Sequence, residues 1–208
     1  MAKAPIPGLA KTRLVPRLGP EGAAEVHAVL LERTLRLAAA SGFASVALWC
    51  APSSRSPFFQ ALRAGAAFEL RDQPGGDLGA RMLAAFEVHL AAGGQVVMVG
   101  TDCPELVAAH LDAARAALSG GADAVLLPAA DGGYAAIGLA RVDRSLFEGV
   151  PWGSSAVLEE TRERLRLLGW KAAELSPVRD VDRPEDLEWL LRSGLLGEDE
   201  RARIAPYV

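Results

Sequence analysis

The residues best suited to chemistry lie in a proline-rich segment near the N-terminus, Lys3–Leu14 (KAPIPGLAKTRL). Its charges and that of Arg17 are the first four of the chain, and all are positive. Two prolines stiffen the segment, and a glycine lets the backbone approach a ligand closely. Converging cations on a rigid loop suit a di- or triphosphate. The alternative is a solvated basic terminus. The candidate phosphate-binding residues are Lys3, Pro7, Gly8, Lys11, Thr12 and Arg13.

This segment is not a Walker A loop, because it has no Gly-Lys-Ser/Thr after a four-residue gap. Lys11 and Arg13 are the candidates for a catalytic role, because positioned cations stabilise the charge that develops on leaving phosphates.

A candidate metal ligand is Asp102, in Gly100–Pro104 (GTDCP), which directly follows the apolar run Gln95–Gly100. Because that run does not alternate, we expect a strand buried on both faces, as in a parallel sheet. Ligands bind at the carboxyl ends of such strands, so Asp102 is expected to face the site and hold Mg²⁺ or Mn²⁺. Alternatively, Asp102 only caps the next helix.

Two further acids, Asp180 and Asp182, lie at the end of the last predicted strand. If the topology brings them beside Asp102, two carboxylates could share one metal ion. Glu185 and Asp186 follow Pro184 and are better explained as first-turn residues of a helix, where they favour its dipole.

The segment Gln73–Arg81 predicts a helix that begins after two glycines, with Asp77 as its N-cap. A helix N-terminus with a glycine-rich entry can bind an anion. We therefore include Asp77 and Arg81 among the phosphate-binding candidates, the alternative for Arg81 being a solvated helix arginine.

Two later motifs are candidates for the acceptor pocket. The first motif, Asp131–Tyr134, contains a hairpin turn signal, so a purely structural role is an equal alternative. In the second motif, Trp152–Ser155, the tryptophan could stack on a ligand or pack against a helix start, and the serines are natural helix caps. Their residues are Asp131, Gly132, Gly133, Tyr134, Trp152, Ser154 and Ser155.

Composition limits the function classes. Of the 208 residues, 50% are hydrophobic and 23% are charged, as in soluble globular proteins with a sizeable core. The net charge of −4 argues against nucleic acid as the main partner. Two cysteines are too few for a disulfide framework, and no signal peptide or transmembrane run is seen. We therefore predict a cytoplasmic protein with no membrane partner.

Other catalytic classes find no support. The three histidines fall in separate predicted helices without zinc-ligand spacing. No Ser-His-Asp or Cys-His arrangement is found, and Cys103, which precedes a proline, is interpreted as a packing residue.

Strand and helix patterns alternate along the chain, with turn residues between them. Strands are predicted at 45–50, 68–70, 95–100, 124–128, 134–139 and 170–175, and helices at 19–42, 56–64, 77–92, 106–119, 154–168 and 184–193. This alternation predicts an α/β fold of three layers, with a mostly parallel, doubly wound sheet and one antiparallel hairpin. We predict one domain over residues 1–193 and a loosely attached C-terminal tail over 194–208.

The ordered motifs resemble an uncharacterised bacterial family of the glycosyltransferase-A, or nucleotide-diphospho-sugar transferase, superfamily. The family's members are described as transferases associated with radical-SAM or selenium-domain genes. The matching pieces are KAPIPGLAKTRL, DLGAR, GTDCPEL, DGGY, PWGSS and DVDRPEDL.

The superfamily includes the phospholactate and molybdenum-cofactor guanylyltransferases. Resemblance to them implies that Lys11 and Arg13 hold nucleotide phosphates and that Asp102 holds Mg²⁺. Related chains place a hydrophobic strand directly before the basic loop, whereas this sequence begins with Met-Ala-Lys. The first strand is therefore expected to be missing or truncated.

The sequence thus predicts a Mg²⁺-dependent, nucleotidyltransferase-like enzyme that uses a nucleoside triphosphate and a small-molecule acceptor. A glycosyltransferase that uses a nucleotide-diphosphate sugar is the first alternative, and a non-catalytic nucleotide-binding module is the second. Exposed strand edges and the C-terminal residues could support a homodimer, although nothing in the sequence requires one.

Overall fold

The computed structural model describes residues 1–64 and 68–208. The strands are β1 (Ala2–Lys3), β2 (Ala47–Ala51), β3 (Glu69–Asp72), β4 (Val96–Val99), β5 (Ala124–Pro128), β6 (Tyr134–Leu139) and β7 (Ala172–Glu174). The helices are α1 (Val15–Ala39), α2 (Pro57–Arg63), α3 (Leu78–Ala91), α4 (Ala108–Ser119), α5 (Val157–Leu167), α6 (Pro184–Arg192) and α7 (Glu198–Ile204). Short 3-10 helices are η1 (Thr12–Leu14), η2 (Arg144–Leu146) and η3 (Ala205–Tyr207). Each predicted strand and helix therefore has a counterpart in the structure.

The chain forms two compact units. Unit 1 comprises Met1–Asp72, Thr101–Leu106 and Arg179–Val208, and unit 2 comprises Gln73–Gly100 and Val107–Val178. The prediction of one domain over residues 1–193 stays a prediction.

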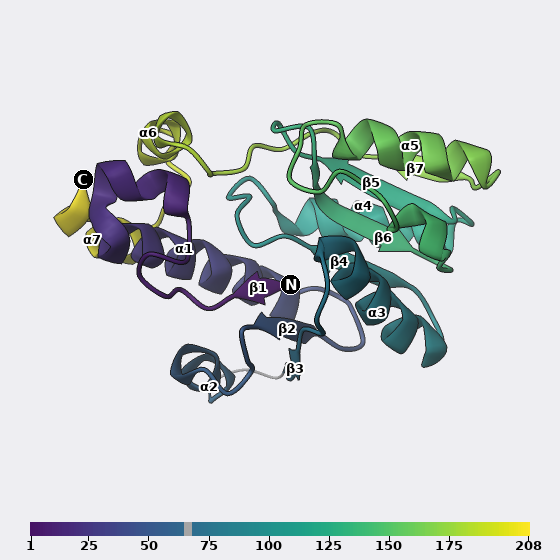
Figure 1. Ribbon diagram of the computed structural model, residues 1–208, viewed down its shortest axis with the longest axis horizontal. Coiled ribbons are helices and arrows are strands. Elements are labelled where there is room, and N and C mark those ends of the chain that lie inside the picture. The colour runs from purple at the N-terminus through teal and green to yellow at the C-terminus, as the bar shows by residue number, and fades with distance from the viewer. Residues whose placement is uncertain (65–67) are drawn as a thin grey trace. The chain divides into compact units, whose positions relative to one another are not determined.

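Unit 1 is built on a parallel sheet of order β1-β2-β3. The first strand has two residues, which pair with Cys50 and Ala51 of β2. Figure 1 shows the long helix α1 crossing this unit. Gly19 at its start has a left-handed φ of 71° and is followed by Pro20, so the regular helix begins after a kink.

The C-terminal residues of unit 1 correct one expectation, because they are not a loosely attached tail. They form α7, which lies along α1 (Figure 1). Leu196 and Ile204 are buried against α1 and α6. Arg203 adds ion pairs to Glu25 and Glu32. The apolar side chains of this short segment complete a core that α1 alone would leave exposed to water.

Unit 2 is built on a mixed sheet of order β4-β6-β5-β7. The predicted hairpin is confirmed, since β5 and β6 are antiparallel neighbours. Strand β6 also pairs antiparallel with β4, whereas β7 runs parallel to β5. Helix α4 packs on this sheet through Ala114 and Leu118.

The prediction that Gln95–Gly100 is buried on both faces, as in a parallel sheet, is wrong. Strand β4 is only half-buried, and in the described residues it pairs with the antiparallel β6. The fully buried strand of unit 2 is β5, because β6 and β7 cover both of its edges. A short apolar run does not reveal whether its neighbours are parallel or antiparallel.

The α/β class is confirmed. Helices alternate with strands, and among the described residues three of the five strand pairings are parallel. No described helix combines the length and apolar character needed to cross a membrane.

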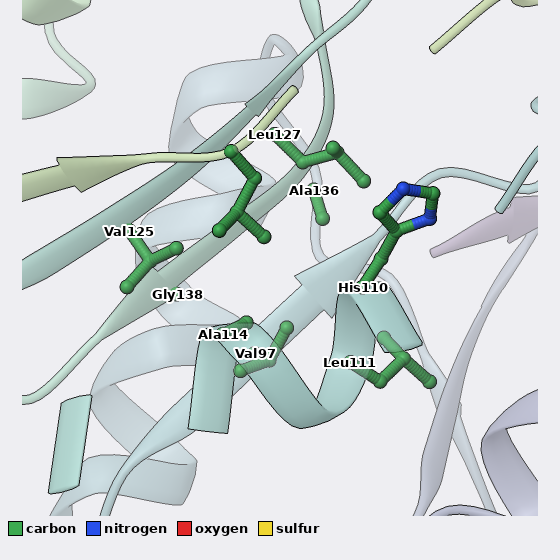
Figure 2. A pocket seen from close by; sticks show the side chains of 9 residues that line it. Val97, His110, Leu111, Ala114, Val125, Leu127, Ala136 and Gly138 are labelled. Atoms are coloured by element: carbon green, nitrogen blue, oxygen red, sulfur yellow. The ribbon is translucent and has the colours of Figure 1, made fainter. Parts of the chain in front are cut away.

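A small apolar hollow lies between α4 and the sheet of unit 2. Figure 2 shows aliphatic side chains of both surfaces facing each other there, with His110 among the residues that line it. The hollow has no room for a water molecule. It is therefore a packing seam and not a ligand site.

Candidate functional site

The basic loop of unit 1 has a fixed backbone. The backbone nitrogens of Leu9 and Ala10 donate hydrogen bonds to the carbonyl oxygen of Ile6, at 2.9 and 3.1 Å. Lys11 then adopts left-handed dihedral angles, φ 44° and ψ 47°, and the nitrogen of Leu14 donates to its carbonyl at 2.8 Å. In the described residues Lys11 is the one non-glycine residue with a positive φ. Such strain persists where the surrounding structure holds it, and it is common at functional sites.

This loop directs the Lys11 side chain inward. Its ammonium lies 3.0 Å from Oδ2 of Asp102 and 3.7 Å from Oδ1 of Asp182. The side chain of Lys11 is only 6% exposed. The backbone nitrogen of Val181 donates to the carbonyl of Asp102 at 2.9 Å, which holds the two acidic segments together. The juxtaposition on which the shared-site hypothesis depended is therefore present.

Lys11 and Asp102 stabilise each other in their charged forms. Burial alone would lower the pKa of Lys11, but the charges and hydrogen bond of the neighbouring carboxylates outweigh it and raise that pKa. Burial alone would raise the pKa of Asp102, but the Lys11 ammonium lowers it. Asp180, 8% exposed, adds a further negative charge close to Lys11. The surrounding acids thus favour a cation at this point.

The other loop candidates lie further out. Arg13 is 58% exposed and forms an ion pair with the carboxylate of Asp182. The remaining candidates of the loop are exposed, namely Lys3, Pro7, Gly8 and Thr12. Exposed cations leave donors available to an incoming phosphate. The phosphate-binding role of these residues stays a prediction.

The structure disfavours a capping role for Asp102, because α4 begins at Ala108 and its N-cap is Val107. No group of three or more His, Cys, Asp or Glu residues positioned to hold a metal occurs within residues 1–64 and 68–208. Two converging carboxylates are nevertheless the usual protein contribution to a Mg²⁺ site whose other ligands are water and substrate phosphates. The donor set therefore fits such an ion, although the ion itself is a proposal.

Sequence reasoning missed His27 of α1. Its Nε2 lies 2.9 Å from the carbonyl oxygen of Lys3, and because a carbonyl only accepts, this nitrogen donates. The residue is 8% exposed, and its Nδ1 is buried without a partner in the described part of the chain. Burial lowers the pKa of His27. An apolar helix pattern alone gives no signal for this contact.

Cys103 behaves as expected of a packing residue. It is buried, and burial raises the pKa of its thiol, so it is not a nucleophile at neutral pH.

Unit 2 carries the remaining candidates. Asp77 is the N-cap of α3, as predicted, and accepts from the nitrogen of Ala80 at 2.8 Å. The Nε of Arg81 donates to the carbonyl of Gly76 at 3.0 Å, and its Nη1 lies 3.5 Å from Oε1 of Gln73. Arg81 therefore holds the glycine-rich entry of the helix, a contact that neither alternative predicted, and its phosphate-binding role stays a prediction.

The two acceptor-pocket motifs are in contact with each other. Gly132 has φ +89°, and a Cβ on it would lie 2.3 Å from the carbonyl oxygen of Ser155. The nitrogen of Leu158 also donates to the carbonyl of Gly132 at 2.9 Å. The adjacent Tyr134 is half-buried, and burial raises the pKa of its hydroxyl. The turn is thus both a hairpin connection and a surface that packs on the second motif.

Trp152 lies against the start of α3. A Cβ on Gly79 would lie 2.5 Å from its Nε1, which is buried and has no partner in the described residues. Helix α5 begins at Val157, three residues later than the predicted start at Ser154, and Ala156 is its N-cap. The Ser154 hydroxyl accepts from the nitrogen of Ala156 at 3.3 Å, so this serine ends the loop instead of capping the helix.

Comparisons with known proteins identify the family and a similar fold. The bacterial family DUF2064, described as uncharacterized proteins conserved in bacteria, matches residues 34–154. The chain belongs to this family. The matched range contains Asp102 and all the unit 2 candidates except Ser155, whereas the basic loop, Asp180 and Asp182 lie outside it.

The chain is also similar to the crystal structure of a putative nucleotide-diphospho-sugar transferase from Desulfovibrio desulfuricans G20. The TM-score is 0.85 at 27% sequence identity, and the match covers 99% of this chain and 95% of that chain. No curated protein matches the chain. The similarity supports the nucleotide-diphospho-sugar transferase superfamily for this DUF2064 protein, with the basic loop inside the matched length.

Proposed function

We propose that this protein is a metal-dependent transferase that moves a nucleotidyl group from a nucleoside triphosphate to a small acceptor. The observation that carries the proposal is the convergence of Lys11, Asp102 and Asp182 on one point of unit 1. A strained loop residue, a buried ammonium and two acids from distant segments are more organised than a solvated terminus requires. The similar structure, named a putative nucleotide-diphospho-sugar transferase, supports the transferase class.

The proposed roles follow from charge and position. Asp102 and Asp182 would hold Mg²⁺, which would supply charge neutralisation on the phosphate oxygens. Lys11 and Arg13 would donate hydrogen bonds to the phosphates, and positioned donors are most effective where charge develops. The acceptor-pocket candidates, including Tyr134 and Trp152, would bind the acceptor, and Asp77 and Arg81 stay candidates for phosphate binding.

In the proposed reaction an oxygen of the acceptor attacks the α-phosphorus. The bond between this phosphorus and the bridging oxygen to the β-phosphate breaks, and pyrophosphate leaves with that electron pair. The cations of the loop stabilise the charge on pyrophosphate. This catalysis depends on positioning and electrostatics, so it needs no nucleophilic side chain.

Glycosyl transfer from a nucleotide-diphosphate sugar is the second candidate, and the name of the similar structure favours it. The products discriminate the two reactions, because nucleotidyl transfer releases pyrophosphate and glycosyl transfer releases a nucleoside diphosphate. We would incubate the protein with each donor, a panel of hydroxylated and phosphorylated acceptors and Mg²⁺, and quantify both products. Asp102→Asn is the negative control. Release of nucleoside diphosphate alone would replace the nucleotidyl proposal with the glycosyl one.

A further inference from the structure

The position between Asp102 and Asp182 is filled by the chain itself. The Lys11 ammonium lies 3.0 Å from one carboxylate and 3.7 Å from the other, and its side chain is 6% exposed. The two acidic side chains are more open, at 41% and 31% exposed. The cation is therefore the buried member of the group, and solvent reaches the acids from outside.

The backbone fixes this placement. The left-handed conformation of Lys11 is unfavourable for a residue with a Cβ, yet its neighbours hold it through backbone hydrogen bonds. A lysine in an ordinary loop would extend its ammonium into water. Here the loop geometry instead sends the side chain inward to the acids.

A divalent cation shared by the same two carboxylates would lie next to this ammonium. Like charges at such short range repel strongly, and each carboxylate oxygen that binds Lys11 is less available to the metal. A phosphate group offers the ammonium an alternative anionic partner, and the flexible four-carbon stem of lysine allows it to change partners.

We infer that Lys11 keeps free divalent cations out of the position between Asp102 and Asp182, so that the metal enters together with a phosphate group that takes over the ammonium. The inference rests on the proposed function for the phosphate, but its exclusion step concerns only residues of unit 1. Lys11 is then a counter-ion of the two acids in the free protein and a phosphate ligand in the complex with metal and phosphate.

The test measures Mn²⁺ binding without nucleotide, from the loss of the electron paramagnetic resonance signal of free Mn²⁺. Lys11→Met keeps an unbranched side chain, one atom shorter, and removes the charge. It should bind Mn²⁺ at least tenfold more tightly than the wild type, and Asp102→Asn in the same chain should abolish the gain. Lys11→Gly, which tolerates the left-handed backbone, is the second variant in case Lys11→Met does not fold.

The matched control is Arg13→Met, which removes a positive charge from Asp182 while leaving Lys11 in place. We expect less than a threefold gain in Mn²⁺ affinity from it. An equal gain in Arg13→Met and Lys11→Met would overturn the inference, because general charge and not occupancy would then control binding. Equal Mn²⁺ affinity of the wild type and Lys11→Met, including no binding by either, would also overturn it.

The phosphate step is tested with inorganic pyrophosphate and the wild type. Enhanced water-proton relaxation by Mn²⁺ should appear when both are present, at Mn²⁺ concentrations tenfold below those needed without pyrophosphate. Absence of this ternary complex would overturn the release of Lys11 by phosphate. Failure of the proposed function has a different signature, since nucleotides and nucleotide sugars would then not stabilise the wild type while Lys11→Met would still gain Mn²⁺ affinity.

Discussion

The ammonium of Lys11 and the carboxylate of Asp102 are 3.0 Å apart, although 91 positions separate them in the sequence. The carboxylate of Asp182 lies 3.7 Å from the same ammonium. A candidate phosphate ligand is therefore paired with two candidate metal ligands in the free protein. A ligand that binds here must therefore replace one partner in these ion pairs.

Asp102→Asn should abolish the Mg²⁺-dependent part of nucleotide binding. The amide keeps the shape of the side chain but loses the charge that attracts the ion. Calorimetric titration with and without Mg²⁺ measures the effect, and circular dichroism checks the fold. Asp112→Asn, which removes an exposed acid paired with Arg115, is the control and should bind like the wild type. Unchanged Mg²⁺-dependent affinity in Asp102→Asn would remove the metal assignment.

Combined Lys11→Ala and Arg13→Ala should weaken triphosphate binding by several kcal/mol. Each hydrogen bond to a charged group is worth about 1.5–3 kcal/mol. Arg17→Ala removes a charge from the same basic stretch and serves as the control, with an expected effect under about 1 kcal/mol. Equal triphosphate affinity of the double variant and the wild type would mean that the loop does not bind phosphate.

Ile204→Ala should lower the free energy of unfolding by about 2–5 kcal/mol, because it truncates a fully buried side chain of α7. The control is Val208→Ala, where the side chain is 46% exposed and the expected change is under about 0.5 kcal/mol. Urea unfolding followed by circular dichroism gives both values. A loss as small as that of the control would show that α7 is not part of the core.

Gly132→Ala should disrupt the contact between the two acceptor-pocket motifs. Gly149→Ala is a closely matched control, because both glycines have a positive φ but nothing lies within 4 Å of a Cβ on Gly149. The control should cost about 1–2 kcal/mol for the left-handed backbone alone. Gly132→Ala should cost clearly more, since its Cβ would meet the carbonyl of Ser155. Equal unfolding free energies of the two variants would contradict this packing.

Stability should fall as the pH is lowered below the ordinary His27 pKa of 6.5. Burial lowers the pKa of His27 in the folded protein, and the charges of Lys11 and Lys3 lower it further, against the opposing effects of Asp102 and the Lys3 carbonyl. The unfolded chain therefore takes up a proton at higher pH than the folded one, and the stability of the neutral form is lost on acidification.

His27→Gln keeps a donor for the Lys3 carbonyl but does not titrate. Its melting temperature should fall less between pH 7.5 and 5.5 than that of the wild type. A parallel decline in the two proteins would assign the pH dependence to other groups.

Local patterns were sufficient to predict much of the fold. The hairpin at Asp131–Gly133, the N-cap Asp77 and the proline at the start of α6 were all predicted because each depends on neighbours in the sequence. The predictions failed where contacts between residues distant in the sequence determine which residues are buried. The insertion of β6 between β4 and β5 determines how deeply each strand is buried, and the apolar residues of α7 become core only through α1.

For the candidate site, too, the residues could be predicted from the sequence but their contacts could not. Residue types and spacing singled out Lys11, Asp102 and Asp182, because phosphate and metal chemistry require such groups. They could not predict that the lysine would form ion pairs with both acids, since that depends on the left-handed backbone of Lys11 and on the hydrogen bond between Val181 and Asp102. His27 was missed for a related reason, because its partner is a backbone carbonyl that no side-chain pattern reveals.

The most direct test of the central claim is a thermal-shift panel of nucleoside triphosphates and nucleotide sugars, each with and without Mg²⁺, on the wild type and Asp102→Asn. A ligand that binds the native state raises its apparent stability by mass action. We predict a Mg²⁺-dependent rise in melting temperature with one triphosphate, lost in Asp102→Asn. No shift of the wild type with any nucleotide would contradict the account.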